Sequence, residues 1–118
     1  MNTSVRNAII ITILVIVIPL LIFRSCVIYN PNPSDCTIVS TKITAIKEGG
    51  SYDIVFKGSE NESYYINRGI EQGLNLDSLK TNVLNKTVTL HIANLLFGPT
   101  KHISQMRVDD QIIFTEFD

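Results

Sequence analysis

The chain has 118 residues, with 10 basic and 11 acidic side chains and a formal net charge of −1. This length allows one small domain in addition to a terminal segment. From residue 30 onward, eight basic side chains stand against eleven acidic ones, so this part carries a formal charge of −3. The acidic excess argues against nucleic acid as a partner, because phosphate-binding surfaces gather Lys and Arg on one face.

An apolar segment from Ala8 to Phe23 dominates the N-terminal part of the chain. It reads AIIITILVIVIPLLIF, sixteen residues without a charge. As a helix it covers roughly 24 Å, less than the roughly 30 Å hydrocarbon core of a bilayer. The helix is long enough if it continues to Tyr29, with the side chain of Arg24 extending to the headgroups. The segment therefore predicts a transmembrane anchor over residues 8–29, which follows a polar head at residues 1–7 and holds the protein in membrane lipid.

The processing and the orientation of this segment have alternatives. A cleaved signal peptide is one, but no pair of small residues marks a cleavage site, and Phe23 and Arg24 do not suit lipid attachment at Cys26. Basic residues flank the segment on both sides, at Arg6 and Arg24, so the charge rule gives a slight bias. Because the polar head is short, we expect the N-terminus in the cytoplasm and the C-terminal domain outside it.

The two cysteines lie near the end of the membrane segment. Cys26 and Cys36 are separated by nine residues, which include Pro31 and Pro33. This spacing matches no zinc or thioredoxin-like motif. In an extracytoplasmic domain a disulfide between them would tether the first strand to the anchor, and two unrelated thiols are the alternative. Since proline interrupts a helix, residues 30–35 predict a short linker.

Residues 36–47 begin the folded domain. Their sequence, CTIVSTKITAIK, is rich in Ile, Val and Thr and predicts a long strand. Val39, Ile43 and Ala45 share one face at a period of two, whereas Ile46 falls on the other face. This change of phase predicts a β-bulge within the strand, as in strands that turn the corner of a barrel.

The rest of the chain contains further strands and one short helix. Leu76, Leu79 and Val83 recur at helical spacing after the candidate cap Asn75. The expected strands cover residues 52–57, 62–68, 86–92, 102–108 and 111–117, with a loop at 95–100. A mainly-β domain over residues 36–118 with a helix between strands three and four resembles an OB-fold, a small five-stranded barrel. The resemblance lies in architecture alone, and an SH3-like barrel or an open α+β sheet is the alternative.

No residue pattern indicates an enzyme, a metal site or a cofactor. His91 and His102 are the only histidines, and we expect the first on the solvent face of a strand and the second in a loop. Asp109 and Asp110 fit a two-residue turn and lack the ligand spacing of a calcium loop. The glycines occupy turns without a phosphate-binding fingerprint. We therefore expect a non-catalytic protein that needs no cofactor.

One stretch, YYINRG at residues 64–69, combines adjacent tyrosines with an amide and an arginine. In OB domains the outer faces of strands two and three bind oligosaccharides or oligonucleotides. Tyr can stack on a sugar or a base, and Arg offers a planar fork of donors. The plainer interpretation is that the aromatic residues are ordinary strand residues and that Arg68 pairs with Glu71. The predicted ligand surface consists of Asp53, Lys57, Tyr65, Asn67 and Arg68.

These observations together predict a single-pass, membrane-anchored β-barrel domain. We expect a binding or assembly module at an envelope membrane, in contact with a protein or glycan partner. The alternative is an OB-type nucleic-acid-binding domain that faces the cytoplasm, which the acidic excess disfavours. A thiol-redox enzyme is disfavoured because the chain has no C-x-x-C motif.

Overall fold

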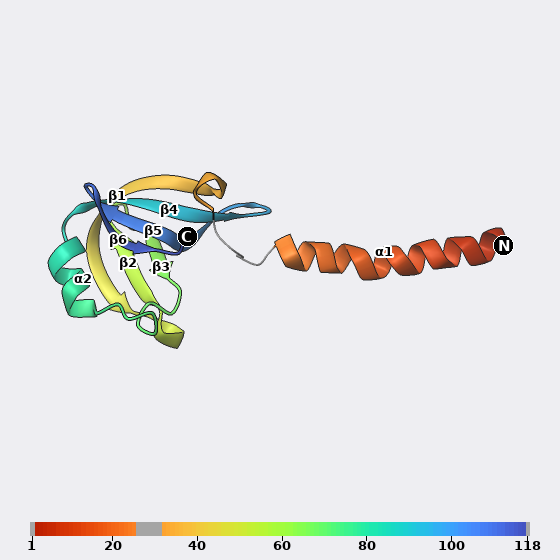
Figure 1. Ribbon diagram of the computed structural model, residues 1–118, viewed down its shortest axis with the longest axis horizontal. Coiled ribbons are helices and arrows are strands. Elements are labelled where there is room, and N and C mark those ends of the chain that lie inside the picture. Colours follow the sequence, from red (N-terminus) through yellow and green to blue (C-terminus); the bar gives the residue numbers. More distant parts are fainter. Residues whose placement is uncertain (1, 26–31, 118) are drawn as a thin grey trace.

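The computed structural model describes residues 2–25 and 32–117. Its first part is one α-helix, α1 (Thr3–Ser25), whose 23 residues extend over roughly 34 Å (Figure 1). None of the apolar window within Thr3–Ile22 is buried, and the mean hydropathy of that window is 2.6. The hydroxyl of Thr12 donates to the carbonyl of Ala8 at 2.8 Å, so this polar group needs no water. Among the described residues, α1 is the one helix that is long and apolar enough to cross a membrane.

The second part of the structure is a small β domain with one short α-helix (Figure 1). It also contains two short 3₁₀-helices, labelled η, of which one precedes β1 and the other links β1 to β2. The elements in chain order are η1 (Pro33–Asp35), β1 (Cys36–Glu48), η2 (Gly50–Tyr52), β2 (Ile54–Gly58), β3 (Ser63–Ile66), α2 (Leu76–Val83), β4 (Thr87–Leu95), β5 (Gly98–Val108) and β6 (Gln111–Thr115).

Five of these strands close into a barrel. The sheet order is β3-β2-β1-β4-β5-β6, and β3 also pairs with β5. That closing contact is parallel and joins Tyr65 to His102, whereas the other neighbouring strands are antiparallel. The circuit β1-β2-β3-β5-β4, with α2 between the third and fourth strands, is consistent with an OB-like fold, so this prediction is confirmed. The sixth strand lies outside the circuit and extends the sheet beside β5.

A β-bulge bends β1, as its sequence predicts. Ile43 pairs with Gly58, but the next registered pair joins Ala45 to Lys57, so the register shifts between them. An extra residue reverses the alternation of side chains beyond it. Ile43 and Ile46 are therefore both buried, while Ala45 is exposed. The expectation that Ala45 shares the buried face of Ile43 is wrong, because the bulge lies between the two residues.

Other element boundaries also differ from the prediction: β3 covers Ser63–Ile66 instead of residues 62–68, and β6 ends at Thr115 instead of residue 117. Tyr52 does not begin the second strand: it ends η2 with φ of 67° and is 54% exposed, and β2 starts at Ile54. Residues 95–100 do not form a long loop, because β4 runs to Leu95 and β5 begins at Gly98. The turn before β2 is therefore longer than expected, whereas the turn between β4 and β5 is tighter, because strand pairing continues up to Leu95 and Gly98.

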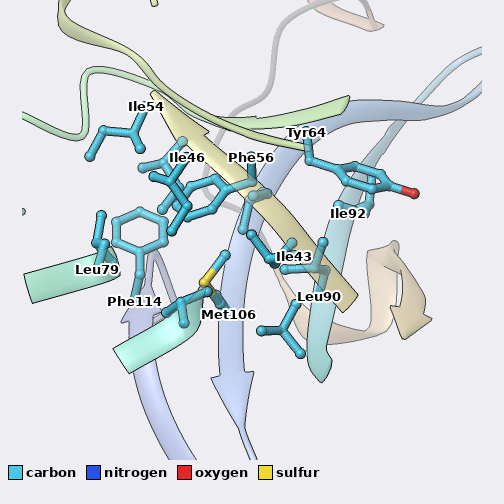
Figure 2. Packing of buried hydrophobic residues seen from close by; sticks show 14 residues of the cluster. Ile43, Ile46, Ile54, Phe56, Tyr64, Leu79, Leu90, Ile92, Met106 and Phe114 are labelled. Atoms are coloured by element: carbon cyan, nitrogen blue, oxygen red, sulfur yellow. The ribbon is translucent and has the colours of Figure 1, made fainter. Parts of the chain in front are cut away.

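The interior of the barrel is apolar, and α2 covers part of it. Asn75 caps this helix by accepting a hydrogen bond from the backbone of Ser78 at 3.1 Å, as the sequence predicts. Figure 2 shows the side chain of Leu79 pointing into the same cluster as the ring of Phe114 from β6. The buried cluster contains Ile43, Ile46, Ile54, Phe56, Tyr64, Ile66, Leu79, Val83, Val88, Leu90, Ile92, Ile103, Met106 and Phe114.

Candidate functional site

The predicted ligand residues lie along β2 and β3. In this ladder Val55 pairs with Tyr65 and Lys57 pairs with Ser63. These residues alternate with the buried Ile54, Phe56, Tyr64 and Ile66, so their side chains face away from the core. Lys57 lies at the far end of β2 from the other predicted residues, which gather around the start of β2 and the end of β3. We call the outer face formed by Asp53, Lys57, Tyr65, Asn67 and Arg68 the β2–β3 surface.

One end of the β2–β3 surface is a turn held by Asp53. A carboxylate oxygen of Asp53 accepts a hydrogen bond from the backbone N–H of Arg68 at 2.8 Å, where Arg68 adopts a φ of 50°. The guanidinium of Arg68 reaches Glu71 at 3.0 Å, and the two side chains are 59% and 42% exposed. An ion pair this exposed contributes little to stability. Arg68 can therefore exchange Glu71 for an external carboxylate or phosphate at small cost.

Tyr65 connects this surface to a buried polar pair that the sequence did not reveal. The rings of Tyr65 and His102 meet edge to face, with centroids 5.6 Å apart. Nε2 of His102 lies 2.6 Å from a carboxylate oxygen of Glu116. His102 is 5% exposed, so the prediction of a loop histidine is wrong. It is buried because β5 starts earlier than expected and pairs with β3, β4 and β6.

Cys36 and Ser104 lie next to this pair, and we call Cys36, Tyr65, His102, Ser104 and Glu116 the tail cluster. Burial raises the pKa of the Cys36 thiol above 9.0, and the negative charges of Asp35 and Glu116 raise it further. Burial, followed by the charges of Asp53 and Glu116, also raises the pKa of Tyr65 above 10.0. Both groups therefore stay protonated at neutral pH.

The predicted disulfide partner Cys26 lies outside the described residues, so the Cys26–Cys36 bond remains a prediction. The other cysteine, Cys36, is the first residue of β1 and has contacts on two sides. Cys36 pairs with Ala93 of β4, and its sulfur approaches the carbonyl of Asn32 at 3.5 Å. The thiol of Cys36 is half-buried rather than fully enclosed.

The segment after β6 continues alongside β5. The backbone N–H of Glu116 donates to the carbonyl of Ser104 at 2.8 Å. The ring of Phe117 meets that of His91 edge to face, with centroids 5.6 Å apart. His91 is therefore half-covered instead of freely solvated as predicted, and its Nδ1 is buried without a hydrogen-bond partner among the described residues. No local sequence signal identifies these contacts, because they join β4 and β5 to the segment after β6.

An open cleft of about 500 Å³ lies between β1 and the β2–β3 turn. Its floor contains a hydrogen bond of 2.6 Å from the hydroxyl of Thr41 to the carboxylate of Glu62. This bond is the largest cause of a pKa for Glu62 below the ordinary value of 4.5. Tyr64 also lines this cleft, and the ammonium of Lys101 lies 5.0 Å from its ring centre in a cation–π contact.

The described residues contain no group of three His, Cys, Asp or Glu side chains that could hold a metal ion. Comparisons with protein-family models, with curated proteins and with solved structures found no match.

Proposed function

We propose that this protein is a single-pass membrane protein whose OB-like barrel is a non-catalytic binding or assembly module at an envelope membrane. The observation that carries the proposal is the combination of an apolar helix, exposed on all sides, with a small barrel that leaves the OB ligand face accessible. A helix that is apolar all round is stable when lipid surrounds it. We further propose that the N-terminus is cytoplasmic and that the barrel is extracytoplasmic.

The β2–β3 surface supports a binding role. Its Lys57, Asn67 and Arg68 are exposed, and its Tyr65 is partly exposed, with its ring packed edge to face against that of His102. A partly immobilised aromatic ring beside an arginine suits a glycan or a protein loop, because the ring loses little entropy on binding and the guanidinium recognises carboxylates. We infer that the partner is a protein or a glycan.

The chemistry of the tail cluster supports a non-catalytic role. A nucleophilic cysteine needs a lowered pKa, whereas the pKa of Cys36 is raised by burial. His102 is enclosed and its Nε2 is bound to Glu116, so this nitrogen is not directed at a cleft. We infer that these polar residues fasten the C-terminal segment to the barrel.

Partner capture from native membranes tests the binding role. The full-length chain carries a photo-crosslinker at exposed Ser59, and its adducts are compared with those of a Tyr65→Ala/Arg68→Ala variant. Lys80→Ala is the matched control, because Lys80 is an exposed cation on α2. A defined adduct that persists in the control and disappears in the double variant supports the proposal. Identical adducts in all three proteins would remove the β2–β3 surface from consideration.

Cysteine accessibility tests the orientation. Single cysteines replace exposed Ser4 or exposed Ser59 in a cysteine-free chain, and intact cells are treated with a membrane-impermeant maleimide. The proposal expects labelling at position 59 in intact cells and at position 4 only after lysis. The reverse pattern would place the barrel in the cytoplasm. Salt-sensitive binding of single-stranded oligonucleotides would then be the assay for the alternative function.

A further inference from the structure

The β4–β5 hairpin presents two large apolar side chains at its tip. Leu95 pairs with Gly98, so Leu96 and Phe97 form the turn between the strands. Leu96 is 58% exposed, and Phe97, at 91%, is the most exposed large apolar side chain in the described part of the chain. Two-residue hairpin turns usually carry Asn, Asp or Gly, whose backbones adopt the required conformation. The formation of the turn therefore does not explain why Leu and Phe occupy it.

The hairpin holds this tip away from the barrel. Asn94 pairs with Pro99, so the ladder continues almost to the turn, and Gly98 supplies the positive φ of 119° that closes it. The side chain of Asn94 also hydrogen-bonds that of Thr37 on β1 at 2.8 Å. Because the strands are paired up to the tip, Leu96 and Phe97 cannot fold back onto the core without breaking these bonds.

The tip lies at the end of the barrel that the chain reaches from α1. Cys36, the first residue of β1, pairs with Ala93, so the hairpin extends beyond the start of β1 (Figure 1). Ten residues separate Ser25, the last residue of α1, from Cys36. Even fully extended, this connection spans at most about 40 Å. A barrel on so short a connection keeps this end close to the membrane that holds α1.

The opposite end of β5 has the opposite character. There the β5–β6 turn consists of Asp109 and Asp110, and the side chain of Asp110 is fully exposed. Anionic lipid headgroups repel carboxylates. The boundary between headgroups and acyl chains, in contrast, accommodates apolar and aromatic side chains. β5 thus has an apolar turn at one end and an acidic turn at the other. This difference is what we expect of a barrel whose β4–β5 hairpin faces a bilayer and whose β5–β6 turn faces water.

We propose that Leu96 and Phe97 insert into the interfacial layer of the same membrane that α1 spans, as a second attachment of the barrel. This inference rests on the proposed function, because it needs α1 to be in the membrane. Insertion of the tip by roughly 5–10 Å, the depth that interfacial apolar groups reach, would fix the barrel's orientation. In this proposal, lipid surrounds the side chains of Leu96 and Phe97.

Tryptophan fluorescence tests this, because the chain contains no Trp of its own. Three full-length variants, each with a single Trp, are reconstituted in bilayers: Phe97→Trp at the tip, Leu14→Trp in α1, and Ile112→Trp as the control. Ile112 is 53% exposed on β6, next to the acidic turn. Each variant is measured with brominated lipid and with the aqueous quencher acrylamide, and thermal unfolding verifies that the barrel is intact.

The inference expects the Phe97→Trp variant to show blue-shifted emission, strong quenching by brominated lipid and protection from acrylamide, whereas the Ile112→Trp control shows none of these. Lipid quenching of the Leu14→Trp variant together with solvent-like emission of the Phe97→Trp variant would overturn the second attachment and leave the anchor intact. Protection of the tip indole from both quenchers would mean that protein covers the tip, which also overturns the inference. Absence of lipid quenching in the Leu14→Trp variant would overturn the anchor and the proposed function with it.

Discussion

Replacing Glu116 with alanine should destabilise the barrel by removing the partner of a buried histidine. In the structure the side chains of His102 and Glu116 are 6% and 20% exposed, and 2.6 Å separates their bonded atoms. A buried polar group that loses its partner costs about 1–3 kcal/mol. Because water can enter where the partly exposed carboxylate was, we expect a loss of about 1–2 kcal/mol from the free energy of unfolding, in the lower part of that range. Glu116→Gln keeps an acceptor oxygen and should lose less.

The measurement is urea unfolding of the full-length protein in detergent micelles, followed by the near-ultraviolet circular dichroism of the barrel tyrosines. Glu71→Ala is the control, because its partner Arg68 is 59% exposed and the loss of such a pair costs less than about 0.5–1 kcal/mol. If Glu116→Ala loses no more than Glu71→Ala, then the His102–Glu116 contact does not stabilise the fold and the role assigned to the tail cluster is wrong.

Three more expectations concern single contacts in the barrel domain. Asn75→Ala should cost about 1 kcal/mol of unfolding free energy by removing the cap of α2, whereas Asn82→Ala, at an exposed position inside the helix, should cost nothing measurable; equal losses would contradict the cap. The pKa of Glu62 lies below 4.5 in the folded state, so its bond from Thr41 stabilises the fold above pH 4.5 and this contribution is lost as the pH falls through the folded-state pKa. Thr41→Val should therefore flatten the decline of the melting temperature in acid, and parallel declines would refute this. In a chain with Cys36 as its single cysteine, the raised pKa predicts slow alkylation by iodoacetamide at pH 7 and acceleration up to and beyond pH 9; a fast reaction at neutral pH would show an activated thiol.

Local patterns were enough to predict the architecture of the barrel. Alternation located the strands, the spacing of Leu76, Leu79 and Val83 located α2, and a change of phase within β1 located the bulge. These features depend on neighbours within a few positions in the chain. The boundaries at Tyr52 and in the 95–100 segment failed because pairing with a partner strand decides where a turn ends, and that partner is distant in sequence.

The candidate site could be predicted only in part for the same reason. Asp53, Tyr65 and Arg68 were expected on one surface because the OB resemblance places the second and third strands side by side, and the turn joining Asp53 to Arg68 agrees with this. The burial of His102 depends on Glu116, which lies 14 positions away across a hairpin, and on Tyr65, which belongs to another strand. In the sequence His102 follows the charged Lys101 at the start of an expected strand, which indicates an exposed position.

The closing contact between β3 and β5 determines where the barrel can come apart. A single registered pair, Tyr65 with His102, completes the circuit, while longer antiparallel ladders hold the other strands together. A fluctuation that separates this pair would unroll the barrel into a twisted six-stranded sheet whose free edges are β3 and β6. Amides along this seam should exchange with solvent before those of β4, because local opening follows the weakest contacts. The newly exposed edge of β3 could then pair with a second chain, so strand exchange between copies would begin at this seam.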